Sequence, residues 1–232
     1  VTDEYYQNAL ELDVENMLKL DADRLLAGFR ETAGYAAGMS ASEIKEYMKN
    51  KERYGGNWEN SLIGGHILGH YMSAVAQGIV NPGVTAEQKE KLTERLNYII
   101  DSLADCQKKT EGVTGIEGYI FGATLPSSEF KKNVVLQFDN VESGKTNIST
   151  QAWVPWYTMH KILAGLTDAY EVAGNETALE VANKLATWIA DRANSWDTST
   201  QNKVLSVEYG GMNDALYQLY KVTDASNKED FY

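Results

Sequence analysis

Apolar residues recur along the chain at the spacing of helices, and the alternation typical of strands is scarce. Val14 and Leu18 belong to an expected opening helix, and the apolar positions within 25–29 predict its continuation or a second helix. Ser40 and Thr85 each precede Glu or Gln by three residues, which is typical of a capping box at a helix start. Further helices are expected over about 62–79, 86–108, 155–172, 176–191 and 211–223.

The expected helices are of two kinds, and the two kinds alternate. Those that begin near residues 62, 156 and 211 are rich in Gly, Ala and aromatic residues and have few charges. Those that begin near residues 86 and 176 have one charged face. Low-charge helices are typical of the inside of a fold and charged amphipathic helices of the outside. The three low-charge helices also open alike, as a degenerate repeat does. We therefore predict an all-α fold, an α/α toroid built from helical hairpins.

A glycine-rich, polar segment interrupts this pattern at about 110–152, where we expect a long irregular loop. Its apolar patches at 118–121 and 134–138 are candidates for short strands. A connection of this length in a compact domain is usually functional or disordered. Because the segment ends at Trp153, we predict that it lies over the mouth of a cleft.

The end of the chain predicts an unfinished pattern. Ser226 and Glu229 have the spacing of a capping box, yet the chain stops at Tyr232, which is too soon for a stable helix. The helix near residue 211 then lacks an outer partner. We therefore expect residues 1–232 to be the N-terminal portion of a longer catalytic domain, and its open edge to expose apolar surface that favours self-association.

Charge and composition exclude several classes of partner. The formal net charge is −12, which argues against nucleic acid because binding to phosphates rests on cationic side chains. It is compatible with a neutral ligand such as a sugar. No apolar run approaches the roughly 20 residues that span a bilayer. The first residues lack the features of a signal peptide, so either a cytosolic protein or a removed leader fits. The single cysteine, Cys106, lies in an apolar helical stripe, which predicts a buried and unreactive thiol.

The three histidines of the chain fall in two short segments, 64–71 and 153–161, and each segment opens an apolar helix. Trp58 precedes the first segment, and Trp153 and Trp156 lie in the second. An indole offers a flat apolar face to the C–H groups of a sugar, and polar side chains beside it bind the hydroxyls. This mixture predicts a sugar-binding cleft.

In the first segment His66 and His70 are four residues apart and share one helix face. Such a pair can bind zinc, but a third ligand is missing from this helix. Contacts to a substrate or within the cleft are therefore favoured over a metal site, with a structural role on an inner helix as the alternative. Glu59, just upstream, is either a ligand contact or a charge that stabilises the helix N-terminus.

The second and third openings repeat the mixture. Pro155 suits a first helical turn, which places Trp156 and His160 about one turn apart. Trp156 is either a platform for a sugar or a packing residue of the core. Before the helix near residue 211, Glu208 and Asn213 again provide a carboxylate and an amide beside an aromatic residue. Three such openings predict a ring of polar groups around one cavity.

Four of these segments together resemble a known family: 55–59, 65–71, 155–166 and 208–213. They are similar to the β-L-arabinofuranosidases, glycoside hydrolase family 127 and its relatives. The resemblance spans roughly 20–223. It implies an (α/α)6 barrel, usually followed by β-sandwich domains, in a secreted or cell-surface bacterial enzyme. The implied activity is the release of L-arabinofuranose from plant glycans.

The resemblance also implies where the reacting groups lie. Family members have a zinc site of three cysteines and one glutamate, with one cysteine as nucleophile and a separate glutamate as acid/base. These motifs come later in the family's sequence than Tyr232, and Cys106 matches none of them. The resemblance therefore implies about half of the barrel, inactive alone, without metal ligands or nucleophile. It implies the pocket residues His66, His70, Trp156, His160, Glu208 and Asn213.

Two other functions remain open at this point. Glu59 and Glu208, at two helix mouths, could form the acid/base pair of another toroidal carbohydrate-active enzyme. A non-catalytic carbohydrate-binding or scaffolding module is the third interpretation. The continuation of the gene would discriminate, since a downstream Glu-x-Cys and a Cys-Cys pair would indicate the zinc enzyme.

Overall fold

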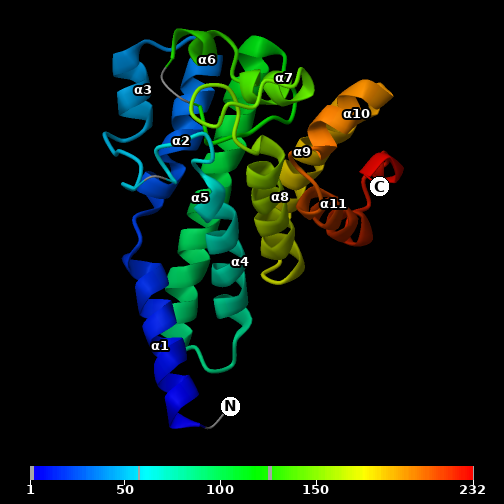
Figure 1. Cartoon of the computed structure of the whole chain (residues 1–232). Coiled ribbons are helices and arrows are strands. Elements are labelled where there is room, and N and C mark those ends of the chain that lie inside the picture. The colour runs from blue at the N-terminus through cyan, green and yellow to red at the C-terminus, as the bar shows by residue number, and fades with distance from the viewer. Residues whose placement is uncertain (1–2, 57, 125–126, 232) are drawn as a thin grey trace.

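The computed structural model describes residues 3–56, 58–124 and 127–231, and this described part is helical with no strand (Figure 1). The longer helices are α1 (Glu4–Lys19), α2 (Ala22–Ala36), α4 (His66–Val80), α5 (Ala86–Thr114), α8 (Pro155–Glu171), α9 (Glu176–Asn194) and α11 (Gly211–Val222). The shorter ones are α3 (Ala41–Tyr47), α6 (Ser128–Lys132), α7 (Leu136–Glu142), α10 (Thr198–Leu205) and the 3-10 turn η1 (Lys228–Phe231).

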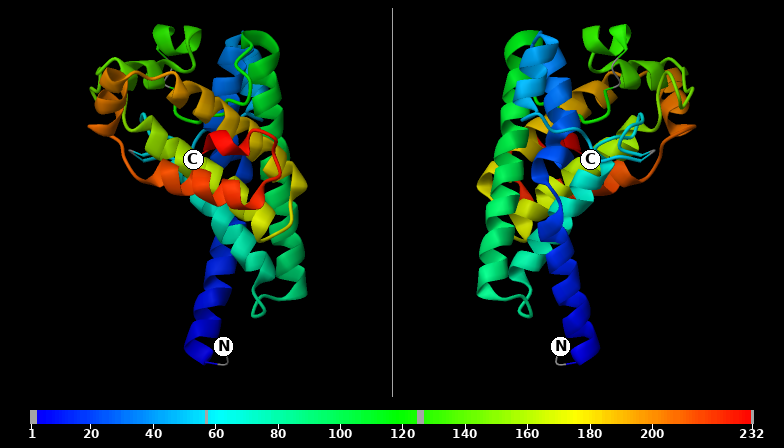
Figure 2. Two further views of the ribbon diagram at one scale, coloured as in Figure 1. Left: turned by 90° about the vertical axis from the view of Figure 1, so that its right-hand side faces the viewer. Right: turned by 90° about the vertical axis from the view of Figure 1, so that its left-hand side faces the viewer.

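The helices form two layers, as the charge pattern predicts. Helices α4, α8 and α11 lie side by side, and α5 and α9 pack behind them. Helix α4 contains no Asp, Glu, Lys or Arg, whereas α5 is charged along much of its length. The arrangement is a portion of an α/α toroid, with the low-charge helices as its inner row. Helix α2 packs on α5, and α1 extends away from the rest of the bundle (Figure 2).

Two glycines allow α4 and α8 to cross at very close range. A Cβ atom on Gly69 would overlap the backbone carbonyl of Lys161, and one on Gly165 would lie 2.5 Å from the carbonyl oxygen of Gly69. Since no side chain fits between the two backbones, the crossing requires glycine at both positions. The close contact holds the first turn of α4 against the second and third turns of α8, and His70 and His160 lie beside this contact.

The predicted helix starts are largely confirmed. Ser40 and Thr85 form the expected capping boxes, and Pro155 is the first residue of α8. Helices α1 and α2 are separate, because Asp21 caps a new helix with its side chain. The start expected at residue 62 lies later, since Gly65 adopts a φ of 90° just before α4. The C-terminal capping box leads only to η1, and Tyr232 lies outside the described residues.

The segment at about 110–152 is more ordered than a loop. Its first residues extend α5 to Thr114, and the strand expected at 134–138 is wrong because α7 begins at Leu136. The patch at 118–121 has no regular element, and its Tyr119 and Phe121 are fully buried against the α7 residue Phe138. Burial of these aromatic rings makes this part of the segment belong to the core, and the position of the segment over a cleft stays a prediction.

Three further observations bear on function. The Cys106 side chain is buried, and burial raises the pKa of its thiol to about 12, as expected for an unreactive cysteine. None of the described helices is long and apolar enough to cross a membrane. Large apolar side chains are exposed on α1 and at α10 and α11, among them Tyr5, Leu205 and Tyr217. Self-association through such surface stays a prediction.

Candidate functional site

The opening of α4 is closed by a carboxylate from the preceding loop. No side chain at the Gly65 N-cap position can cap the helix, and the Glu59 Oε2 atom instead accepts the Gly65 N–H at 2.8 Å. Glu59 is buried. The His66 Nδ1 atom lies 3.1 Å from the Ile63 carbonyl oxygen and 3.2 Å from Glu59 Oε1. Of the two roles left open for Glu59, the structure therefore supports the one that stabilises the helix N-terminus.

Two indoles stand beside this opening. The Trp58 ring is 54% exposed, with its centroid 5.1 Å from that of His66 and 6.2 Å from that of Trp153. The backbone N–H of Trp153 donates to Gln137 Oε1 at 3.1 Å. Trp58 therefore presents an open aromatic face next to an imidazole. Asn57, which belongs to the same motif, lies outside the described residues.

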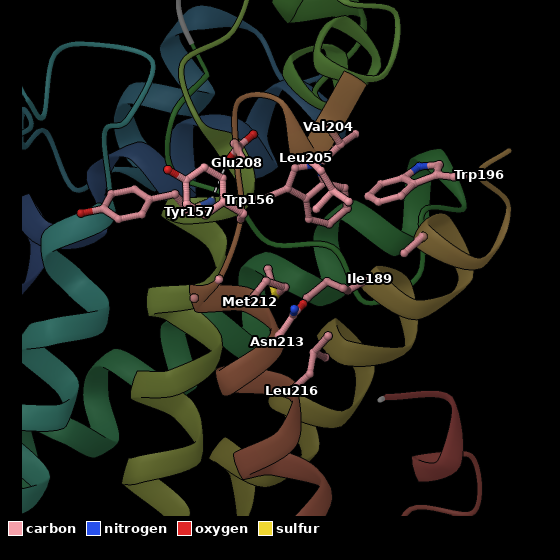
Figure 3. A pocket seen from close by; sticks show the side chains of 14 residues that line it. Trp156, Tyr157, Ile189, Trp196, Val204, Leu205, Glu208, Met212, Asn213 and Leu216 are labelled. Carbon is pink, nitrogen blue, oxygen red and sulfur yellow. Dashed lines mark hydrogen bonds between the residues drawn. The ribbon is translucent and has the colours of Figure 1, made fainter. Parts of the chain in front are cut away.

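The start of α8 is also capped by a glutamate side chain, which here comes from much farther away in the sequence. Val154 precedes the helix with a φ of 43°, and its side chain cannot cap. Glu208 reaches back from the loop before α11, and its Oε2 atom accepts the Tyr157 N–H at 2.8 Å (Figure 3). Burial raises the pKa of Glu208 to about 7, against the lowering effect of the backbone N–H groups of Trp156 and Tyr157.

A buried lysine connects the two openings. The Lys161 Nζ atom, on α8, lies 2.8 Å from His70 Nε2 on α4 and 2.8 Å from the Tyr157 hydroxyl. It also lies 4.1 Å from the centroid of the Tyr157 ring, in a cation–π contact. The His70 side chain is itself exposed. Burial, and then the charges of Lys161 and His66, lower the pKa of His70.

His160 ties α8 to the third opening. A Cβ atom on Gly211, the first residue of α11, would lie 2.6 Å from His160 Cε1, so the ring rests directly on the α11 backbone. Its centroid is 5.3 Å from that of Tyr157. Burial and the nearby Lys161 charge lower the pKa of His160. The ring thus lies half-buried beside the lysine, where its neutral form is favoured.

The other three candidates line a pocket of about 140 Å³ among α8, α9, α10 and α11 (Figure 3). Asn213 is exposed there and Glu208 is buried. Trp156 is only 5% exposed, with its ring against those of Phe138 and Trp196 at 4.8 and 5.3 Å between centroids. Its burial supports core packing over a sugar platform. The six candidates thus fall into two adjoining groups, and Tyr157 contacts both.

A family model for the GH127 β-L-arabinofuranosidase catalytic domain matches residues 1–227. The chain belongs to this family. A search of curated proteins finds no match. The family match confirms the resemblance seen in the helix openings, and it identifies the chain as a glycoside hydrolase domain of the β-L-arabinofuranosidase type, with a carbohydrate as its substrate.

The described residues of this GH127 domain do not fit a zinc ion. Within them, no group of three or more His, Cys, Asp or Glu side chains could hold a metal. Cys106 is buried, and its Sγ atom lies 3.3 Å from the Tyr47 hydroxyl oxygen. In the His66–His70 pair, His66 Nδ1 faces two oxygen acceptors and His70 Nε2 faces Lys161. We therefore derive no chemical step through a metal from these residues.

Sequence reasoning did not select two residues of this candidate site, Lys161 and Tyr157, although Tyr157 lies in the same helix opening as Trp156 and His160. Lys161 is the only Lys or Arg in α8, and it follows His160 directly. A lone cation on a low-charge inner helix was the available signal, because burying an ammonium group is costly without polar partners. Its partners, however, come from α4 and from the preceding turn of α8, and the sequence does not show that these meet.

Proposed function

We propose that this domain binds an L-arabinofuranose unit of plant glycans across the openings of α4 and α8, and so forms part of the pocket of a β-L-arabinofuranosidase. The observation that supports this most is the gathering of an exposed indole, three imidazoles and a lysine–tyrosine pair at adjacent helix openings of a GH127 domain. Such groups match the apolar faces and hydroxyls of a neutral sugar.

Exposure decides which groups face the sugar. Trp58 is 54% and Tyr157 is 42% exposed, whereas Trp156 is 5% exposed. We therefore assign the stacking role to Trp58 and the hydrogen-bonding roles to the exposed His70 and Tyr157 and to the half-buried His160, whereas the buried His66 lies beside the Trp58 ring. Asn213 would bind the next part of the glycan, because it lies exposed at the neighbouring pocket.

We place the reacting groups outside these 232 residues. The resemblance implies zinc bound by cysteines, with a cysteine nucleophile and a glutamate acid/base, whereas this chain has the buried Cys106 alone. The domain would then need the rest of the protein for turnover. Action on plant glycans also favours a secreted or cell-surface location for the whole protein, and we include that in the proposal.

Hydrolysis of nitrophenyl β-L-arabinofuranoside tests the proposal. We expect turnover by the longer parent protein, loss of turnover on zinc chelation, and none by residues 1–232. His160→Gln in the parent should lower kcat/KM by about tenfold or more, equivalent to about 1.4 kcal/mol for one lost contact to the sugar. Hydrolysis by residues 1–232 would overturn the placement of the reacting groups, and an inactive parent would overturn the activity.

The carboxylate-pair mechanism has one supporting observation. The Glu208 pKa of about 7 lies in the range of a general acid. Against it, Glu59 and Glu208 are both buried, and each accepts a backbone N–H at a helix start. Full activity of a Glu208→Gln parent would remove this mechanism.

A further inference from the structure

Lys161 is an unusual buried cation. The residue is only 8% exposed. No carboxylate of the described residues lies within 4.0 Å of its Nζ atom. Its neighbours are neutral: the His70 imidazole, the Tyr157 hydroxyl and the Tyr157 ring face. Buried charges normally have an ionic partner or several hydrogen bonds. Lys161 therefore donates hydrogen bonds to the side chains of His70 and Tyr157, two residues that are also exposed at the surface.

The direction of these hydrogen bonds follows from the chemistry of the ammonium group. An ammonium has three donors and no acceptor. His70 Nε2, at 2.8 Å, must then present its lone pair, so the ring is neutral and its proton is on Nδ1. The Tyr157 oxygen likewise accepts from Lys161 at 2.8 Å, which leaves its own hydrogen free to point elsewhere. Both groups become hydrogen-bond donors.

We propose that Lys161 is a positioning residue that fixes His70 as an Nδ1–H donor and the Tyr157 hydroxyl as a donor to the oxygen atoms of the bound sugar. That a sugar oxygen is the acceptor rests on the proposed function, whereas the Nδ1–H tautomer of His70 follows from its hydrogen bond with Lys161 alone. A neutral imidazole free in water prefers the proton on Nε2, so Lys161 selects the less common form. The exposure of His70 and Tyr157 leaves both donors accessible to a ligand.

The glycine crossing makes this arrangement rigid. Gly69 precedes His70 and lies against the Lys161 backbone, where a Cβ atom would overlap the Lys161 carbonyl. The two residues joined by the Lys161–His70 hydrogen bond are therefore also held by backbone contact between α4 and α8. Sites on rigid elements keep their donors in place better than sites on loops. The close crossing and the hydrogen bond thus act on the same pair of side chains.

Nuclear magnetic resonance of the histidine side chains tests the inference directly, because the chain has only three histidines. Long-range proton–nitrogen correlation of the 15N-labelled protein identifies the protonated nitrogen in each ring, and a His70→Gln variant assigns His70. We expect His70 to bear its proton on Nδ1 at pH 7.5. Lys161→Met should shift this ring towards the Nε2–H form and raise its pKa. Lys91→Met, at an exposed lysine of α5 paired with Glu87, is the matched control and should leave the ring unchanged.

A proton on Nε2 of His70 in the unmodified protein would overturn the inference, and so would an unchanged tautomer in Lys161→Met. If Lys161→Met fails to fold, the spectrum of the unmodified protein still decides. Addition of methyl β-L-arabinofuranoside separates the two proposals. If the Nδ1–H form is present but the His70 signals do not respond to the sugar, the positioning by Lys161 stands and the sugar acceptor of the proposed function fails.

Discussion

The openings of α4 and α8 solve one structural problem in two ways. Neither helix has a side chain at its own N-cap that can bind the first backbone N–H groups. Each instead takes a buried glutamate from elsewhere, Glu59 at α4 and Glu208 at α8. A carboxylate at a helix N-terminus is favoured both by the hydrogen bond and by the helix dipole.

The two glutamates differ in what surrounds the second carboxylate oxygen. In Glu59 that oxygen lies 3.2 Å from His66 Nδ1, and the residue comes from six positions before the N–H it accepts. Neither second oxygen has a hydrogen-bond partner among the described residues, and Glu208, which α9 and α10 separate from α8 in sequence, also has no imidazole or cationic nitrogen within 4.0 Å there. Burial raises the pKa of Glu208 to about 7. The local cap thus has an imidazole beside it, whereas the distant one joins the loop before α11 to the start of α8 at an electrostatic cost.

The largest loss of stability should come from a substitution that forces α4 and α8 apart at their crossing. Gly69→Ala places a methyl group against the backbone of Lys161, and neither backbone can move without shifting its whole helix. We expect a loss of more than about 3 kcal/mol in unfolding free energy, at the upper end for overpacked cores. This corresponds to a fall in Tm of about 10 °C, measured by circular dichroism.

Gly112→Ala is the matched control for this substitution. Gly112 lies in the exposed part of α5, and a Cβ atom there meets nothing within 4 Å. Alanine is the better helix former by about 1 kcal/mol, so this variant should be as stable as the unmodified protein or slightly more stable. Equal behaviour of the two variants would contradict the close crossing.

A second effect, of about 3 kcal/mol, should appear in the pH dependence of stability that Glu208 causes. The pKa of Glu208 rises on folding from 4.5 to about 7. Between these values the folded protein keeps a proton that the unfolded chain releases, so this carboxyl group lowers the unfolding free energy as pH rises from about 4.5 to 7. Above pH 7 its effect is constant, and below 4.5 it vanishes. The size follows from about 1.4 kcal/mol for each pKa unit.

Urea unfolding of Glu208→Gln at several pH values isolates this effect, because glutamine cannot titrate. Relative to the unmodified protein, the variant should gain about 3 kcal/mol between pH 4.5 and 7.5. Glu59→Gln tests the other cap at a single pH of 7.5, where we expect a loss of about 1 kcal/mol from the weaker hydrogen bond to Gly65. A flat difference curve for Glu208→Gln would refute the assigned pKa.

Much of the fold was predictable because the pattern of charge and glycine is local. The low-charge helices form the inner row, and the capping residues at Ser40 and Thr85 act as expected. Helix α10 and the helical form of 136–142 were missed, because short elements depend on what they pack against. The aromatic rings of that region are buried in the core, and periodicity does not indicate such burial.

The site was predictable by residue type more than by role. The clustering of the histidines and of Trp58 pointed to the correct openings. Trp156 and Trp58 were indistinguishable as indoles, and only packing shows that one is buried and the other open. The link between Lys161 and His70 spans 91 residues and depends on a helix crossing that no local pattern reveals.

The most direct test of the account is a titration with methyl β-L-arabinofuranoside, followed through the side-chain resonances of the three histidines. If α4 and α8 open onto one sugar-binding cleft, the signals of His66, His70 and His160 should all move, and they should give a single dissociation constant. Signals that stay unchanged at saturating sugar, or that give separate constants, would contradict the shared cleft.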